Sequence, residues 1–122
     1  MNLIETDQRF RHRKDLDGFA RALFEIDAAL ARWLGRLRSG DLLVVTADHG
    51  VDPLQQGSDH TREHAPLLAL TGMMAQRLSD GGHLAGRRHD GLLCDVGASV
   101  MRWLTGRDAQ ALPGESFLGE HS

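Results

Sequence analysis

The sequence predicts an α/β fold in which a mainly parallel sheet is flanked by helices. Residues 16–37 show helical periodicity, and two continuous apolar runs follow at residues 41–47 and 65–71. Strands that are buried on both faces have this apolar character, and they are typical of parallel sheets covered by helices. A chain of 122 residues is long enough for one domain, so we treat residues 1–122 as a single segment.

The first predicted helix has apolar residues at alternating steps of three and four. They are Leu16, Phe19, Leu23, Ile26, Leu30, Trp33 and Leu37. Asp15 is the expected N-cap, and Ser39-Gly40 the expected stop. The same spacing would suit a coiled coil. Five alanines between residues 20 and 31 widen the apolar face, which favours a helix that lies on a sheet.

The remaining elements follow in order along the chain. The runs "DLLVVTA" and "APLLALT" predict strands, and the Gly- and Arg-rich residues 76–91 predict a loop. Residues 95–106 predict a helix with Asp95 near its N-cap and Gly106 near its C-cap. Its expected inward residues are Val96, Val100, Trp103 and Leu104. The tail after residue 111 is expected to be irregular. Two or three strands are few for a stable doubly wound sheet.

Composition indicates a soluble globular protein and excludes several partner classes. The net charge is −3, with 41% hydrophobic and 25% charged residues, so nothing favours nucleic acid or an anionic membrane as a partner. No apolar run approaches the roughly 20 residues that span a bilayer, and the N-terminus does not resemble a signal peptide. Cys94 is the only cysteine, which excludes a disulfide framework and fits a cytoplasmic location.

The candidate site begins where the strand 41–47 ends. In open α/β sheets, ligands bind beyond the carboxyl ends of the strands, and Asp48 and His49 follow that end directly. On a continuing strand the two side chains would point to opposite sides. They can therefore serve one centre only if the chain bends at Gly50, or they serve two adjacent centres. His60 returns after a loop long enough to fold back over the strand end.

A second cluster of potential ligands lies upstream, at Asp7 and His12. Carboxylate and imidazole together suit Mn²⁺, Zn²⁺ or Fe²⁺. The five candidates Asp7, His12, Asp48, His49 and His60 are more than one ion needs, whereas two ions about 3.5–4 Å apart would use them. Structural readings remain open: Asp48 could cap a turn, His64 could merely lie near the site, and His83, His89 and His121 could be solvated.

The stretch "TADHGVDPLQQGSDHTREHAPLLAL", residues 46–70, resembles the phosphopentomutase family of the alkaline phosphatase superfamily. That family carries T-A-D-H-G at a strand end, then a D-P pair, then G-T-D-H-T-R-E and a proline before the next strand. Ser58 replaces the family's threonine. Upstream, "NLIETDQRFRHRKDLDGFARALFEIDAALARWLGRL" is similar to the family's N-x-V-D-x-D and H-R-R-D segments. "DHTRE" distinguishes this family from related mutases and phosphatases.

The resemblance implies a fold, an activity and a set of metal ligands. It implies part of an alkaline-phosphatase-like core, without the N-terminal strands and the cap domain. Asp48 and His49 would bind one Mn²⁺, and Asp7, His12 and His60 the other. The family interconverts ribose 1-phosphate and ribose 5-phosphate, and the deoxyribose pair, through a phosphothreonine, so the implied substrate is a pentose phosphate.

The chain also departs from the family pattern. Arg11 replaces a glycine, Leu54-Gln55 replaces a T-W pair, and "RRHDGLLCD" stands where the family has G-H-R-E-T-F-A-D, with His89 and Asp95 as matching positions. No threonine has the family's nucleophile context, so we expect the nucleophile, like the cap, to lie outside this chain, in a missing N-terminal part.

Two other functions remain open. One is another superfamily phosphotransferase or phosphodiesterase. The other is a non-catalytic metal-binding fragment that self-associates through the exposed face of helix 16–37. The roles of Arg62, His64 and His89 are left unassigned.

Overall fold

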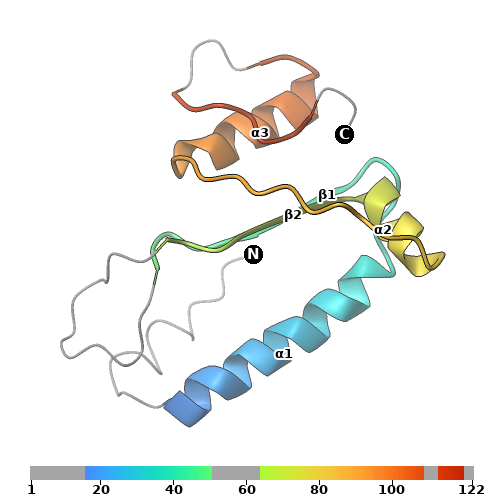
Figure 1. The fold of residues 1–122 in the computed structure, drawn as a ribbon, viewed down its shortest axis with the longest axis vertical. Helices are drawn as coiled ribbons and strands as arrows, with labels where there is room; N and C mark the ends of the chain where they lie inside the picture. Colours follow the sequence, from blue (N-terminus) through green and yellow to red (C-terminus); the bar gives the residue numbers. More distant parts are fainter. Residues whose placement is uncertain (1–15, 51–63, 109–112, 120–122) are drawn as a thin grey trace.

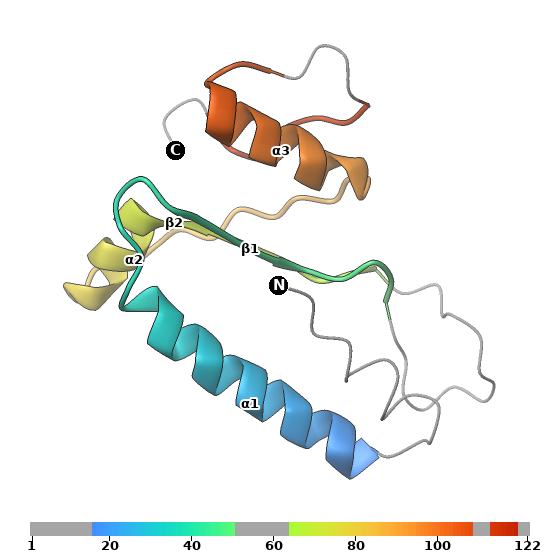
Figure 2. The same ribbon diagram turned by 180° about the vertical axis from the view of Figure 1, so that it is seen from behind.

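A computed structural model describes residues 16–50, 64–108 and 113–119. The elements follow in the order α1 (Leu16–Leu34), β1 (Leu42–Thr46), β2 (Leu67–Thr71), α2 (Gly72–Ser79) and α3 (Cys94–Thr105). The two strands lie between α1 on one side and α3 on the other, as the opposite views of Figures 1 and 2 both show. The predicted α/β class is confirmed.

Helix α1 realises the predicted periodicity but ends at Leu34, three residues earlier than expected. The next residue, Gly35, has a poor helix propensity. A turn then leads into the sheet, where the Asp41 carboxylate accepts a hydrogen bond of 2.8 Å from the backbone N–H of Arg38. The predicted N-cap, Asp15, is outside the described residues. No helix in the described segments is long and apolar enough to cross a membrane.

The strands β1 and β2 pair antiparallel, with Leu42 opposite Thr71 and Thr46 opposite Leu67. The expectation of a parallel sheet is therefore wrong for this pair, and no parallel pairing occurs among the described residues. The error has a physical reason. A continuous apolar run reports burial on two faces, but strand direction depends on how the chain returns between the strands. An antiparallel edge strand is common in otherwise parallel sheets.

Helix α2 was not predicted from the sequence. Its last residues, 76–79, fall in the stretch 76–91 that was expected to be a loop. It begins directly after β2, where the Thr71 hydroxyl accepts a hydrogen bond of 3.3 Å from the N–H of Met74 and so caps the helix. The residues "MMAQRL" are all good helix formers, which was the available signal. After Ser79 the described chain has no further helix until α3, so the loop is confirmed from residue 80.

Helix α3 was predicted within one residue, and Gly106 ends it in a left-handed conformation with φ of 67°. Its inward face matches the prediction only in part, since Val96 and Trp103 are half-buried. The buried residues are Asp95, Ala98 and Ser99, whereas Val100 and Leu104 are exposed. The reason is that α3 packs its small residues against the C-terminal segment 113–119, whose backbone binds Asp95 and Ser99. That segment is irregular, as expected.

Candidate metal centre

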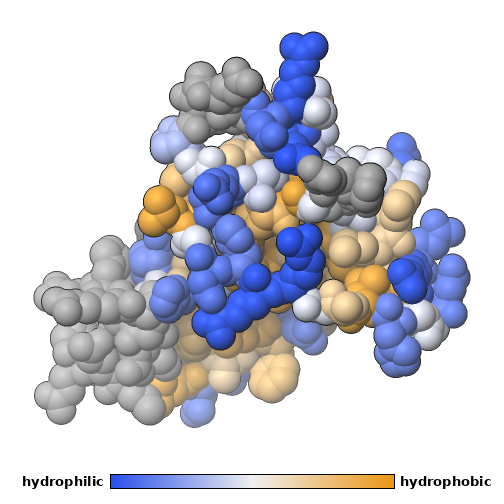
Figure 3. Space-filling view, turned by 45° about the horizontal axis from the view of Figure 1, so that its top comes forward, coloured by the Kyte–Doolittle hydropathy of each residue, from blue (hydrophilic) through white to orange (hydrophobic). Residues whose placement is uncertain are grey.

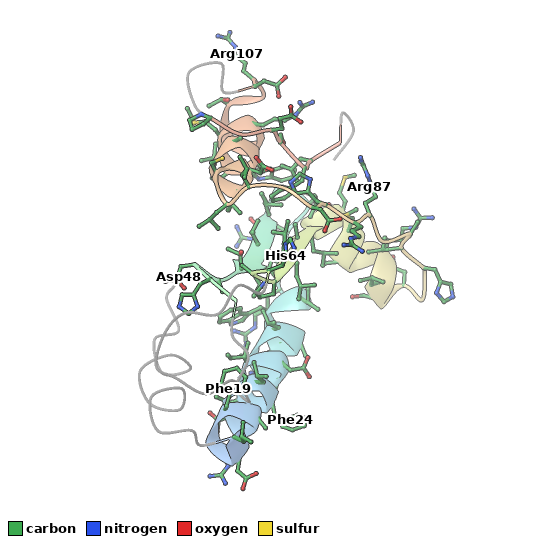
Figure 4. All side chains as sticks on the ribbon, turned by 60° about the vertical axis from the view of Figure 1, so that its left-hand side comes forward. Phe19, Phe24, Asp48, His64, Arg87 and Arg107 are labelled. Carbon is green, nitrogen blue, oxygen red and sulfur yellow. The ribbon has the colours of Figure 1, made fainter. Side chains whose placement is uncertain are left out.

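The carboxyl end of β1 carries Asp48 and His49, which are the described members of the predicted metal site. Thr46, the last residue of β1, lies opposite Leu67, the first residue of β2. Residues 48–50 and the segment that contains His64 therefore flank the same end of the sheet. Figure 4 shows Asp48 and His64 on the two segments that leave this end.

The chain bends at Asp48 and His49, earlier than the predicted bend at Gly50. As a result the two side chains do not point to opposite sides. Oδ1 of Asp48 lies 3.6 Å from Nε2 of His49. Two ligand atoms, each about 2.1 Å from one cation at a near-tetrahedral angle, are about 3.4 Å apart. The spacing thus fits two ligands of a single ion.

A hydrogen bond to the backbone fixes the orientation of the His49 ring. Nδ1 lies 2.9 Å from the carbonyl oxygen of Gly50. A carbonyl oxygen can only accept, so Nδ1 carries the hydrogen, and in the neutral ring the lone pair is on Nε2. Histidines that bind metals commonly donate their other ring N–H to a backbone carbonyl in this way. The side chain of Asp48 is 88% exposed, whereas that of His49 is only 18% exposed, so Asp48 is open to solvent and the ring of His49 is largely covered.

The other predicted ligands, Asp7, His12 and His60, are outside the described residues, and so is Arg62. Within the described segments, no group of three or more His, Cys, Asp or Glu side chains is placed to hold a metal ion. The Asp48–His49 pair could provide two ligands for one ion, which would require others from elsewhere. The chemistry of the two donors fits a divalent ion of borderline hardness.

A second His–Asp pair, between His89 and Asp95, was not predicted from the sequence. Nε2 of His89 donates to Oδ2 of Asp95 at 2.8 Å, so the expectation that His89 is solvated is wrong. The same oxygen accepts from the N–H of Leu92 at 3.0 Å, and Oδ1 accepts from the N–H of Glu115 at 2.9 Å. The Glu115 N–H, then the His89 hydrogen bond, lower the pKa of the Asp95 carboxyl.

This pair holds three parts of the chain together. We call His89, Leu92, Asp95, Ser99, Glu115 and Phe117 the carboxylate latch. Besides the bonds of Asp95, the Ser99 hydroxyl accepts from the N–H of Phe117 at 3.0 Å, and the ring of Phe117 lies 5.5 Å from that of His89. Both oxygens of Asp95 already accept hydrogen bonds from the protein. Asp95 therefore connects parts of the structure and is not available as a general base.

Two glycines are required at the latch. A Cβ at Gly91 would lie 2.0 Å from Oδ2 of Asp95 and 2.4 Å from Nε2 of His89. Gly114 has φ of +105°, which favours glycine, and a Cβ there would lie 2.8 Å from the carbonyl carbon of Cys94. Both glycines therefore let backbone approach Asp95 closely. The pattern of a buried carboxylate between two such glycines could not be recognised from the sequence, because 23 positions separate them.

Arg88 and Asp90 lie on either side of His89 in the chain. Arg88 and Asp90 form an ion pair of 2.6 Å on the surface. The hydrogen bond with Arg88 is the largest cause of the lowered pKa of Asp90, and the charges of His64 and His89 add to it. His64 lies on the segment that enters β2, at the same end of the sheet as Asp48 and His49.

Comparison with known protein families gives the class of this protein. The chain matches the model of the metalloenzyme superfamily over residues 1–106, and it belongs to that superfamily. Among its relatives are two proteins named phosphopentomutase, from Anaeromyxobacter sp. strain Fw109-5 and strain K, which are 41% and 42% identical to it over 120 residues. The matches cover 98% of this chain but 28% of each relative. The resemblance found in residues 46–70 is confirmed.

Proposed function

We propose that this chain is the metal-binding part of a phosphopentomutase. The complete enzyme would interconvert (deoxy)ribose 1-phosphate and (deoxy)ribose 5-phosphate. The observation that carries the proposal is the identity of 41–42% to phosphopentomutases over 98% of the chain. The chain spans little more than a quarter of those relatives, so it would contribute one part of the catalytic machinery, and the phosphorylated threonine would come from the part that it does not match.

Asp48 and His49 would hold one Mn²⁺, and Asp7, His12 and His60 the other. The 3.6 Å spacing of the first pair and the Nδ1–H donated to Gly50 support this role. A bound divalent ion supplies positive charge for the oxygens of a transferring phosphoryl group. Asp48 would add negative charge that favours cation binding, while the Gly50 carbonyl would keep Nε2 of His49 directed at the ion.

A chimera tests the proposal. The matched 120 residues of the strain K phosphopentomutase are exchanged for those of this chain, and conversion of ribose 1-phosphate to ribose 5-phosphate is measured with Mn²⁺. We expect turnover in the chimera, a loss of at least a hundredfold in His49→Ala, and no change in His83→Ala, since His83 is exposed.

Two results would contradict the proposal. One is a folded chimera that binds Mn²⁺ but does not convert ribose 1-phosphate. The other is hydrolysis of phosphodiesters in place of the mutase reaction, which would favour another branch of the superfamily.

A further inference from the structure

The chain contains three Asp-Gly pairs, at residues 17–18, 80–81 and 90–91. In such a pair the amide nitrogen of the glycine can attack the side-chain carboxyl carbon of the aspartate, because no side chain on the glycine hinders it. Water leaves and a five-membered succinimide ring closes. Water then reopens the ring, and when the main-chain carbonyl is cleaved the product is isoaspartate, in which the main chain runs through the former side chain. The net reaction is an isomerisation that needs no other reagent.

The local structure distinguishes the three pairs. The first lies in the first turn of α1, where Gly18 is buried. In the second, the N–H of Gly81 donates to the carbonyl oxygen of Leu78 at 3.1 Å, which makes that nitrogen a poorer nucleophile. The third lies outside any helix or strand, and within the described residues the N–H of Gly91 donates no hydrogen bond. The structure therefore favours the reaction at residues 90–91.

The third pair is open to water and is restrained by Arg88. Nε of Arg88 lies 2.6 Å from Oδ2 of Asp90, and the two side chains are 85% and 55% exposed. The segment that joins α2 to α3 crosses the strands on the side turned toward the viewer in Figure 1, and Figure 3 shows many hydrophilic side chains in a tilted view of that side. The hydrogen bond with Arg88 is the largest cause of the lowered pKa of Asp90. Because water leaves readily only from a protonated carboxyl group, the ion pair slows ring closure.

The main chain at this pair has no room for an added atom. The ring of His89 and the N–H of Leu92 both donate to Oδ2 of Asp95, at 2.8 and 3.0 Å. These two hydrogen bonds close a loop that contains the linkage between residues 90 and 91. Isoaspartate would lengthen the main chain inside that loop by one methylene, and a Cβ at Gly91 would already collide with Asp95 and His89. At least one of the two hydrogen bonds must therefore break.

We propose that Asp90–Gly91 is a site of spontaneous isoaspartate formation, and that this modification opens the carboxylate latch. Arg88 protects the site by keeping the Asp90 carboxylate ionised. The latch in turn is the part of the chain that the lengthened backbone disturbs. The proposal involves neither the metal pair nor the mutase reaction, so it stands or falls apart from the proposed function.

The test incubates the 122-residue chain at neutral pH and measures the isoaspartate fraction at each Asp-Gly pair by peptide mapping. Arg88→Gln removes the ion pair, and Asp90→Glu prevents closure of a five-membered ring. The matched control is Arg87→Gln, because Arg87 is exposed and forms no ion pair within the described segments. Hydrogen exchange of the Glu115 amide, which donates to Asp95, reports the state of the latch.

We expect isoaspartate to accumulate faster at residue 90 than at residues 17 and 80. Arg88→Gln should raise the rate at residue 90 by about threefold or more, because the protonated fraction of a carboxyl group rises with its pKa. Arg87→Gln should change the rate by less than about twofold, because solvent and salt screen an exposed charge that is not in contact. The Glu115 amide should lose its protection in the modified chains and keep it in Asp90→Glu after the same incubation.

Three results would overturn the proposal. The first is no isoaspartate at residue 90, or a faster conversion at residue 80. The second is the same rate at residue 90 in Arg88→Gln and in the parent chain. The third is a chain with isoaspartate at residue 90 that protects the Glu115 amide as well as the unmodified chain does.

Discussion

Gly114→Ala should destabilise the protein through the carboxylate latch. Gly114 has φ of +105°, and an added Cβ would lie 2.8 Å from the carbonyl carbon of Cys94 and 2.9 Å from Oδ1 of Asp95. A residue other than glycine in such a backbone conformation costs about 1–3 kcal/mol. Overpacking against backbone atoms that cannot move away adds about 1–3 kcal/mol. Together these predict a loss of roughly 2–6 kcal/mol in the free energy of unfolding.

The matched control is the same substitution at Gly97, in the middle of α3. An added Cβ there meets nothing within 4 Å and φ is not positive, so alanine should stabilise the helix by about 0.5–1 kcal/mol. Urea unfolding of the full chain, followed by circular dichroism, measures both variants. Hydrogen exchange at the Glu115 amide, which donates to Asp95, locates the effect. If Gly114→Ala were as stable as Gly97→Ala, the latch geometry would be wrong.

Three further predictions concern the latch and the metal pair. Ser99→Ala should cost about 1–3 kcal/mol, because Ser99 is fully buried and the Phe117 N–H would lose its acceptor; Ser39→Ala, at an exposed turn, is the control in urea unfolding. Acid should open the latch. The pKa of Asp95 is lowered by the Glu115 N–H and then by His89, so its contribution to stability is complete above about pH 4 and is lost as the pH falls through the lowered pKa. Exchange of the Glu115 amide against pH measures this, and an unchanged profile in Asp95→Asn would contradict it. In the chimera, Asp48→Asn should weaken Mn²⁺ binding at least tenfold by isothermal titration, since the charged ligand is lost; Asp108→Asn, on the exposed Arg102 pair, should not.

The elements with strong local signals were predictable from the sequence. Helix α1 follows its three–four spacing, and α3 ends at Gly106 as expected. The strand β1 and the position of Asp48 and His49 at its carboxyl end also follow from the apolar run and the polar residues after it. Each of these features depends on the chemistry of consecutive residues.

The features that were missed depend on contacts between distant parts of the chain. The antiparallel direction of β2 is set by the path of the chain between the strands, which an apolar pattern does not encode. His89 was expected to be solvated because its partner Asp95 is six residues away in a different element. The exposure of Leu104 on α3 reflects surface that the described residues do not cover, and periodicity alone predicts burial for such a residue.

The central claim is that Asp48 and His49 bind one of two Mn²⁺ ions in a phosphopentomutase. The most direct measurement is the manganese content of the purified chimera after dialysis, by elemental analysis. We expect two ions per protein in the parent chimera and in His83→Ala, and no more than one in His49→Ala. Two ions retained in His49→Ala, or none in the parent chimera, would contradict it.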